Sequence, residues 1–412
     1  MPSLRFRAAA AVTLACAGLA VATACGPGFL DGLTGGAGTS TPGAPDSGEF
    51  DIGCVGAIPP DAASTTEDGP DVPPITLAFE TVRVSPDPSL DSGAPPPLGF
   101  NQDHLCSCPE RQACTPPDAG SAVRQQICDG DGGTDNGLAG FFTALALLIP
   151  EFRTDFAGER IREGRFSVIV DLSSWNGTPN DPQVRLRIVM SSGMDREASG
   201  GRKKPLYDGT DVWGADPGSI LQGTSKVGQD CRVPTGDLPT CIPSISDPRA
   251  FVRDGKLYAR PFNTENILPL VLLSSVGRIG IDLANATFTA DLTTDANGRP
   301  HMSGEIAGRW AASSIFNAVG NIENPFPLPD GGPSALCESA SDPQGIYNTM
   351  KVGVCAGLDL ALDQRNDSRP SAECAAVSAA LSFTASPATL GHVVDNAPNI
   401  TNCIDWKDDC SR

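Results

Sequence analysis

The residues whose types and spacing could do chemistry lie in the stretch 127–142, which reads "ICDGDGGTDNGLAGFF". Asp129, Asp131 and Asp135 supply three carboxylates in a glycine-rich frame, and Ca²⁺ prefers oxygen ligands of this kind. The stretch departs from the EF-hand pattern, because Gly133 stands at the third ligand position and no glutamate closes the loop. A calcium site at Asp129, Asp131 and Asp135 is one of two interpretations.

The other interpretation is the start of a helix. Apolar residues recur at helical spacing through 138–149, and Pro150 follows them. Asp135 or Asn136 then stands where a side chain caps the free N–H groups of the first turn. The sequence favours the cap, because the apolar pattern predicts the helix independently and nothing independent predicts the metal. In this interpretation Asp129 and Asp131 have no structural role, and no cofactor is expected.

Signatures of the common enzyme classes are missing from the sequence. It has only His104, His301 and His392 as histidines, and it contains no G-x-S-x-G, H-E-x-x-H or phosphate-binding glycine motif. Glu305 and Asp291 could face each other across adjacent strands and resemble the acid pair of a glycosidase. Such a pairing arises easily by chance among 49 acidic residues. The sequence therefore favours a binding or structural role over an enzyme.

The first 25 residues form an export signal. Arg5 and Arg7 give it a charged start, and the apolar run "AAAAVTLACAGLAVA" is shorter than a membrane-spanning helix requires. The segment ends in "VATAC", with Gly26 after Cys25, and so resembles the lipobox of bacterial lipoproteins. The resemblance implies removal of residues 1–24, acylation of Cys25 and an outer-membrane location. The alternative is an ordinary secretory signal cut near Ala24.

Composition makes the chain a polyanion. It has 29 basic and 49 acidic residues, a formal net charge of −20, and 27 basic against 49 acidic once Arg5 and Arg7 leave with the signal. Such a charge repels nucleic acid and anionic membrane surfaces, so no nucleic-acid partner is expected. Residues 25–74 are poor in large apolar side chains and rich in Gly, Pro, Ser and Thr, which predicts a flexible tether.

The cysteines support an oxidising compartment. Of 14, Cys16 leaves with the signal and Cys25 carries the lipid, so twelve remain to form six disulfides. Cys231 and Cys241 flank a short loop and should pair, which leaves five cysteines on either side and requires at least one bridge between the two groups. Zinc binding by "HLCSCPERQAC" is the disfavoured alternative. The twelve are Cys54, Cys106, Cys108, Cys114, Cys128, Cys231, Cys241, Cys337, Cys355, Cys374, Cys403 and Cys410.

Period-two alternation dominates the middle of the chain and predicts a mainly β protein, an antiparallel β-sandwich or meander with a few short helices. The segments "RFSVIVDL" and "QVRLRIVM" form one hairpin, "AFVRDGKLYAR" forms another around Asp254 and Gly255, and alternation continues from Ile279 to Ile306. A helix is expected at "WAASSIFNAVG". Residues 337–412 contain "AECAAVSAALSF", an alanine-rich and helical pattern among five cysteines.

These segments give a domain organisation and a hypothesis about function. We expect a signal peptide at 1–24, a lipid-anchored tether at 25–74, an antiparallel β body at 75–336 and a disulfide-stapled, Cys-rich helical cap at 337–412. The chain then resembles bacterial surface lipoproteins of no established activity, whose partners here would be the membrane, through the anchor, and an envelope component or glycan. The alternatives are a secreted glycan hydrolase and a calcium-assisted carbohydrate-binding protein.

Overall fold

A computed structural model describes residues 59–60, 69–84, 98–107, 114–115, 117, 129–130, 132–149, 152, 156–194, 202–221, 226–232, 241–274, 277–324, 335–342, 345–367, 369, 371–394, 403 and 406–410. Several sequence predictions lie outside the described residues. These are the signal peptide, most of the tether, and the residues Cys25, Cys54, Cys108, Cys128 and Asp131.

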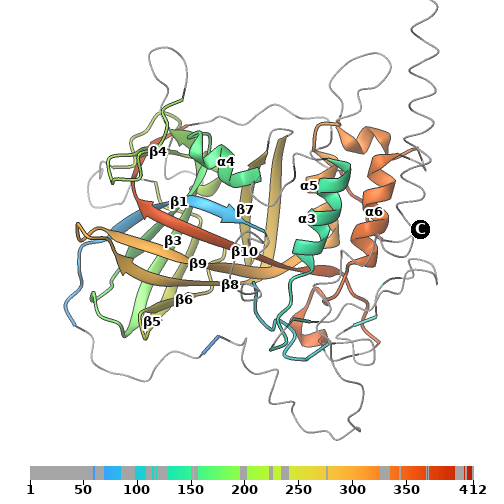
Figure 1. Cartoon of the computed structure of the whole chain (residues 1–412), viewed down its shortest axis with the longest axis horizontal. Helices are drawn as coiled ribbons and strands as arrows, with labels where there is room; N and C mark the ends of the chain where they lie inside the picture. Colours follow the sequence, from blue (N-terminus) through green and yellow to red (C-terminus); the bar gives the residue numbers. More distant parts are fainter. Residues whose placement is uncertain are drawn as a thin grey trace, which may run out of the picture.

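Eight antiparallel strands form a closed barrel (Figure 1). Around the ring each strand is hydrogen-bonded to the next, and the pairing of β3 with β5 completes the circle. In ring order the strands are β3 (Asp181–Met194), β2 (Ser167–Ser173), β1 (Ile75–Arg83), β10 (Ala376–Pro387), β9 (Pro300–Ala311), β8 (Gly277–Thr294), β6 (Lys256–Ala259) and β5 (Ile245–Arg253).

The prediction of a mainly β protein is confirmed, but the sandwich is wrong. Alternation of apolar and polar residues fits any sheet with one covered face, so it cannot tell two stacked sheets from one closed sheet. Two features of the strands accompany closure here. The long strand β8 has an irregularity between Ala284 and Thr287, and an added Cβ at Gly304 of β9 would collide with the backbone of Thr289. Both favour a sharp bend, as barrels require.

Both predicted hairpins are present. β2 pairs antiparallel with β3, and β5 pairs with β6 through a two-residue turn. Asp254 and Gly255 in that turn have φ values of 53° and 81°, the positive values that a type I′ turn needs. Outside the ring, β7 (Ile267–Ser274) pairs with β8, and β4 (Val212–Ala215) joins β3 to the parallel strand β11 (Thr389–Val393).

Apolar side chains fill the interior of the barrel. The alternating residues Val168, Val170 and Leu172 of β2 are all buried in the main hydrophobic cluster. Within this cluster the ring of Phe383 stacks on that of Phe79, with 4.2 Å between centroids, and lies 5.0 Å from the ring of Phe288. An eight-stranded barrel is just wide enough to be filled by its own side chains in this way.

Helices cover parts of the barrel (Figure 1). Near one end, α3 (Gly137–Leu148) and α5 (Ala312–Gly320) pack on α6 (Ile346–Ala356), whereas α4 (Phe156–Arg162) packs on β1 and β7. Short 3₁₀ helices occur at η2 (Pro217–Ser219), η3 (Leu336–Ser339) and η4 (Gln364–Asn366). Both helices that the sequence predicted in the β body are present. Within the described part of the chain, none of the helices has the length and apolar character to span a membrane.

The helical prediction for "AECAAVSAALSF" is wrong, because most of this segment forms β10 between β1 and β9. Alanine favours helices, yet the larger apolar residues Val377, Leu381 and Phe383 are spaced by even numbers and all point into the main core. The small side chain of Ala380 on the other face packs in a separate cluster with Leu98 and Ala307. The C-terminal part is therefore not only a helical cap: it supplies a barrel strand.

Four disulfides are described, and they join elements distant in sequence as well as near ones. They are Cys114–Cys374, Cys231–Cys241, Cys337–Cys403 and Cys355–Cys410. The local pair that the sequence predicted is present, and Cys114–Cys374 is a bridge between the early and the late cysteines, with a sequence separation of 260. Cys106 is also in a disulfide. Cys106 and Cys114 therefore have no free thiolate for zinc.

Candidate functional site

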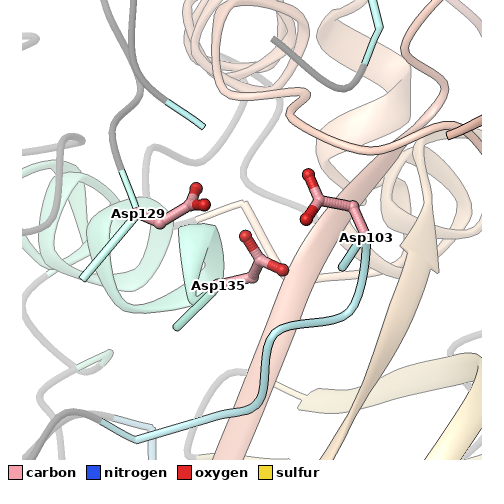
Figure 2. Close-up of side chains that lie close together, drawn as sticks. All are labelled: Asp103, Asp129 and Asp135. Carbon is pink, nitrogen blue, oxygen red and sulfur yellow. The ribbon is translucent and has the colours of Figure 1, made fainter. Parts of the chain in front are cut away.

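Three aspartates gather where the chain enters α3 (Figure 2). One carboxylate oxygen from each of Asp103, Asp129 and Asp135 lies within 4.8 Å of the others. Asp103 and Asp135 are buried, and Asp129 is half-buried. The structure thus brings together two of the three residues of the predicted calcium loop and adds Asp103, which the sequence did not single out.

Backbone pairing between two loops holds the aspartates in place. Asp135 N donates to Phe100 O at 3.2 Å, and Gln102 N donates to Asp135 Oδ2 at 2.7 Å. Gly133 has a φ of 78°, and a Cβ there would come 2.5 Å from the side chain of Asn101. Only glycine fits this close approach. The glycines of the stretch therefore serve the contact between the loops.

Asp103 and Asp129 are both fixed through Ser107. Leu105 N donates to Asp103 Oδ1 at 2.8 Å, and the Ser107 hydroxyl donates to Asp103 Oδ2 at 3.0 Å. Ser107 N donates to Asp129 Oδ2, and Asp129 N donates to Ser107 O at 3.0 Å. The expectation that Asp129 has no structural role is wrong, because its backbone and its carboxylate both hold the neighbouring loop.

Burial makes the charged forms of these carboxyl groups unfavourable. It raises the pKa of Asp129 to about 7, raises the pKa of Asp103, and raises that of Asp135 well above its ordinary value. The neighbouring carboxylates raise all three pKa values further. Burial likewise raises the pKa of nearby Asp359 to about 6, although Ser378 donates to it. Burial therefore favours the neutral forms of these carboxyl groups, whereas a bound cation would favour their charged forms.

A buried ion pair lies beside the aspartates. Arg309, only 1% exposed, donates to both carboxylate oxygens of Asp367, to Ala361 O at 2.7 Å and to Gln102 O at 2.6 Å. Its attraction lowers the pKa of Asp103 by less than burial raises it. Arg309 therefore ties β9 to both flanking loops, but most of its charge is neutralised by Asp367 rather than by the three aspartates.

The helix cap is confirmed, and its residue is Asn136. The side-chain oxygen of Asn136 accepts from Ala139 N at 3.4 Å, while the Ser378 hydroxyl accepts from Gly137 N at 2.7 Å. Asp135 is not the cap. It points instead toward Asp103 and Asp129 (Figure 2).

Asn136→Ala is expected to lower the free energy of unfolding by about 1 kcal/mol, because one orphan N–H of α3 loses its acceptor. Urea denaturation of the purified protein measures this change. Asn297→Ala, in the exposed turn between β8 and β9, is the control and should change stability by less than about 0.5 kcal/mol. An equal effect of both substitutions would contradict the capping role.

The two acids of the predicted hydrolase pair are diagonal neighbours across β8 and β9 rather than directly opposite each other. Glu305 lies opposite Thr289 in the register of β8 and β9, and its carboxylate accepts from Gly99 N at 3.1 Å. Asp291 is 57% exposed and lies 3.7 Å from the ammonium group of Lys256. Each carboxylate thus has a polar partner of its own. Burial raises the pKa of Glu305, and the nearby charge of Asp291 raises it further.

Exposed aromatic side chains can stack on sugars, but two of the tryptophans of this chain are completely enclosed. Trp213 and Trp310 have no exposed surface, and Phe141 packs edge-on against Trp310 with 6.2 Å between ring centroids. Tyr258 stacks on Phe251 at 5.2 Å, on neighbouring strands of the barrel. Trp213 and Trp310 therefore serve the core and cannot stack on a sugar.

Sequence reasoning missed Asp103, Asp359, Arg309 and Asp367. The only local signal at Asp103 is a polar run, "NQDH", which is common in loops. Arg309 follows an alternating strand pattern and looks like an exposed strand residue until the covering loops are known. The chain matches no protein-family model, and neither the curated proteins nor the solved structures contain one similar to it. Any inference about the function of this protein therefore has to be drawn from its own residues.

Proposed function

We propose that the protein is exported, carries a lipid on Cys25 and acts at the outer membrane as a binding or structural component of the cell envelope. The observation that carries this proposal is the "VATAC" signal at residues 21–25 in a chain whose described part already holds four disulfides. Disulfides form and persist in oxidising compartments, and a signal with this ending leads there.

The architecture supports binding or structure rather than catalysis. The barrel interior is packed with apolar side chains, so a ligand would have to bind at the outer surface or at the loops. Glu305 and Asp291, the pair expected of a glycan hydrolase, are not directly opposite each other, and the carboxylate of Glu305 already accepts from Gly99 N. The disulfides stabilise such a body chiefly by restricting its unfolded state.

Cys25→Ser is expected to move the protein from the membrane fraction to the soluble fraction, because a serine cannot carry the lipid. Cell fractionation followed by immunodetection measures this. Cys16→Ser is a matched control within the same signal, and that variant should stay with membranes. Retention of the Cys25→Ser variant in washed membranes would exclude anchoring at this residue.

A second candidate function is divalent-cation binding, favoured by the three carboxylates of Asp103, Asp129 and Asp135 within 4.8 Å. Hard cations such as Ca²⁺ take carboxylate oxygens, and a bound ion would replace the mutual repulsion of the buried charges by attraction. It would also tie the loop of Asp103 to the start of α3. This candidate differs from the predicted calcium loop, because Asp103 is one of its ligands.

A further inference from the structure

Basic residues gather at one place on this acidic protein, at the end of α4 and in the nearby segment 202–206. Six basic and two acidic residues lie in the described ranges 158–165 and 202–206, in a chain of net charge −20. We name the exposed residues Arg162, Arg165, Lys203, Lys204 and Leu206 the basic loop surface. Its positive charge contrasts with the rest of the sequence.

Close backbone packing joins the two segments of the basic loop surface. An added Cβ at Gly164, where φ is 69°, would collide with Lys203 O. A Cβ at Gly193 of β3 would come 2.5 Å from Arg165 O and 2.7 Å from Arg202 Nη1. Glycine at both positions thus allows the turn after α4, the end of β3 and the basic segment to meet, so these cations share one location.

Leu206 projects from the same segment and is 70% exposed. The buried carboxylate of Asp211 holds its backbone, accepting from Leu206 N at 2.9 Å and 3.0 Å and from Tyr207 N at 2.6 Å. A large apolar side chain is therefore fixed in an outward position two residues after an exposed lysine pair. Cations beside an exposed apolar side chain are the combination that proteins use at membrane interfaces.

The positive charge of the lysine pair is not neutralised by ion pairs within the described part of the chain. The one carboxylate in the turn after α4, Glu163, lies 2.8 Å from Arg160 and 2.6 Å from Arg165, so it serves those two arginines. No ion pair of Lys203 or Lys204 occurs among the described residues. Both ammonium groups can contact an anionic partner.

We propose that the basic loop surface docks onto the anionic phospholipid headgroups of a membrane, with Leu206 entering the interface. The remaining negative charge does not prevent this, because at physiological ionic strength charges more than about 8 Å apart are largely screened. The distant acids would instead disfavour other orientations. The lipid on Cys25 in the proposed function would deliver the protein to such a membrane, but the docking itself needs no lipid on the protein.

Sedimentation with vesicles tests the docking without the lipid anchor. A chain of residues 26–412, which lacks Cys25 and therefore the lipid, is mixed with vesicles of phosphatidylglycerol and phosphatidylcholine, or of phosphatidylcholine alone. We expect binding only to the first kind, falling as salt rises. Lys203→Glu with Lys204→Glu should weaken it by about tenfold or more, because each cation near an anionic surface contributes measurably. Leu206→Ser should weaken it as well.

A variant with the same change in net charge controls for general repulsion. Arg185→Glu with Arg249→Glu alters two exposed residues near the start of β3, far from its end at Met194, and should leave binding unchanged. Equal weakening by both double variants, or no binding of the unaltered chain to phosphatidylglycerol vesicles at low salt, would overturn the proposal. Binding to dextran sulfate but not to vesicles would also overturn it. The result is independent of whether Cys25→Ser releases the protein in cells.

Discussion

Arg309→Met is expected to lower the free energy of unfolding by about 3–5 kcal/mol, the usual effect of removing one partner from a buried ion pair. The substitution leaves the carboxylate of Asp367 buried without its cation and deprives Gln102 O and Ala361 O of their donor. Because methionine keeps most of the side-chain volume, the decrease in the free energy of unfolding measures the lost charge and hydrogen bonds rather than a cavity. Urea denaturation measures it.

A double variant separates the effect of the uncompensated Asp367 charge from the effect of the lost hydrogen bonds to Gln102 O and Ala361 O. Arg309→Met with Asp367→Asn removes both charges, and it should recover much of the stability that the single substitution loses. Arg249→Met, at an exposed position of β5, should have little effect. A loss below about 1 kcal/mol for Arg309→Met would mean that the buried pair contributes little to joining β9 and the two loops.

Asp129→Asn is expected to stabilise the protein at pH 7 in the absence of divalent cations. Folding raises the pKa of Asp129 from 3.8 to about 7. The contribution of this group to the free energy of unfolding is therefore fully present below pH 3.8 and is lost as the pH rises to about 7. Asparagine stays neutral throughout. The gain at pH 7 should be on the order of 3 kcal/mol, and the variant should lose less stability than the unaltered protein between pH 4 and pH 7.

Melting temperatures measured with and without calcium show whether Asp103, Asp129 and Asp135 share protons or bind an ion. If the cluster binds Ca²⁺, millimolar calcium should raise the melting temperature of the unaltered protein by several degrees at pH 7, and Asp129→Asn should abolish the rise. Asp254→Asn, at a residue whose side chain is 85% exposed, should keep the rise. An unchanged melting temperature with calcium, together with a stabilising Asp129→Asn, would assign the cluster to proton sharing alone. Differential scanning calorimetry at pH 4 and pH 7, with EDTA or calcium, provides all of these comparisons.

Local patterns predicted those parts of the fold that depend on neighbouring residues. The turn at Asp254 and Gly255 was predictable because both residue types tolerate positive φ, and its flanking residues alternate. The helix beginning at Gly137 was predictable because its apolar spacing and its cap, Asn136, lie within one short stretch. In each case the interactions that decide the structure join residues close in sequence.

Closure of the barrel and the acidic cluster depend on contacts that no local pattern contains. β3 must meet β5 to close the ring, and β10 must pair with β1 although its alanines favour a helix. Asp103 joins Asp129 and Asp135 only because Phe100 pairs with Asp135 across two loops. The sequence therefore indicated the carboxylate-rich stretch but not the third member of the cluster.

The place of β10 in the ring determines when the barrel can close as the chain folds. Leu77 of β1 pairs with Pro387 of β10, so two neighbouring strands come from nearly opposite ends of the chain. All the residues between them must be available before these two strands can meet. Until then β1 has only β2 as a partner, and its other edge is open to incorrect pairing. The body should thus complete its folding only after nearly the whole chain has been synthesised, with slow, non-local closure as the last step.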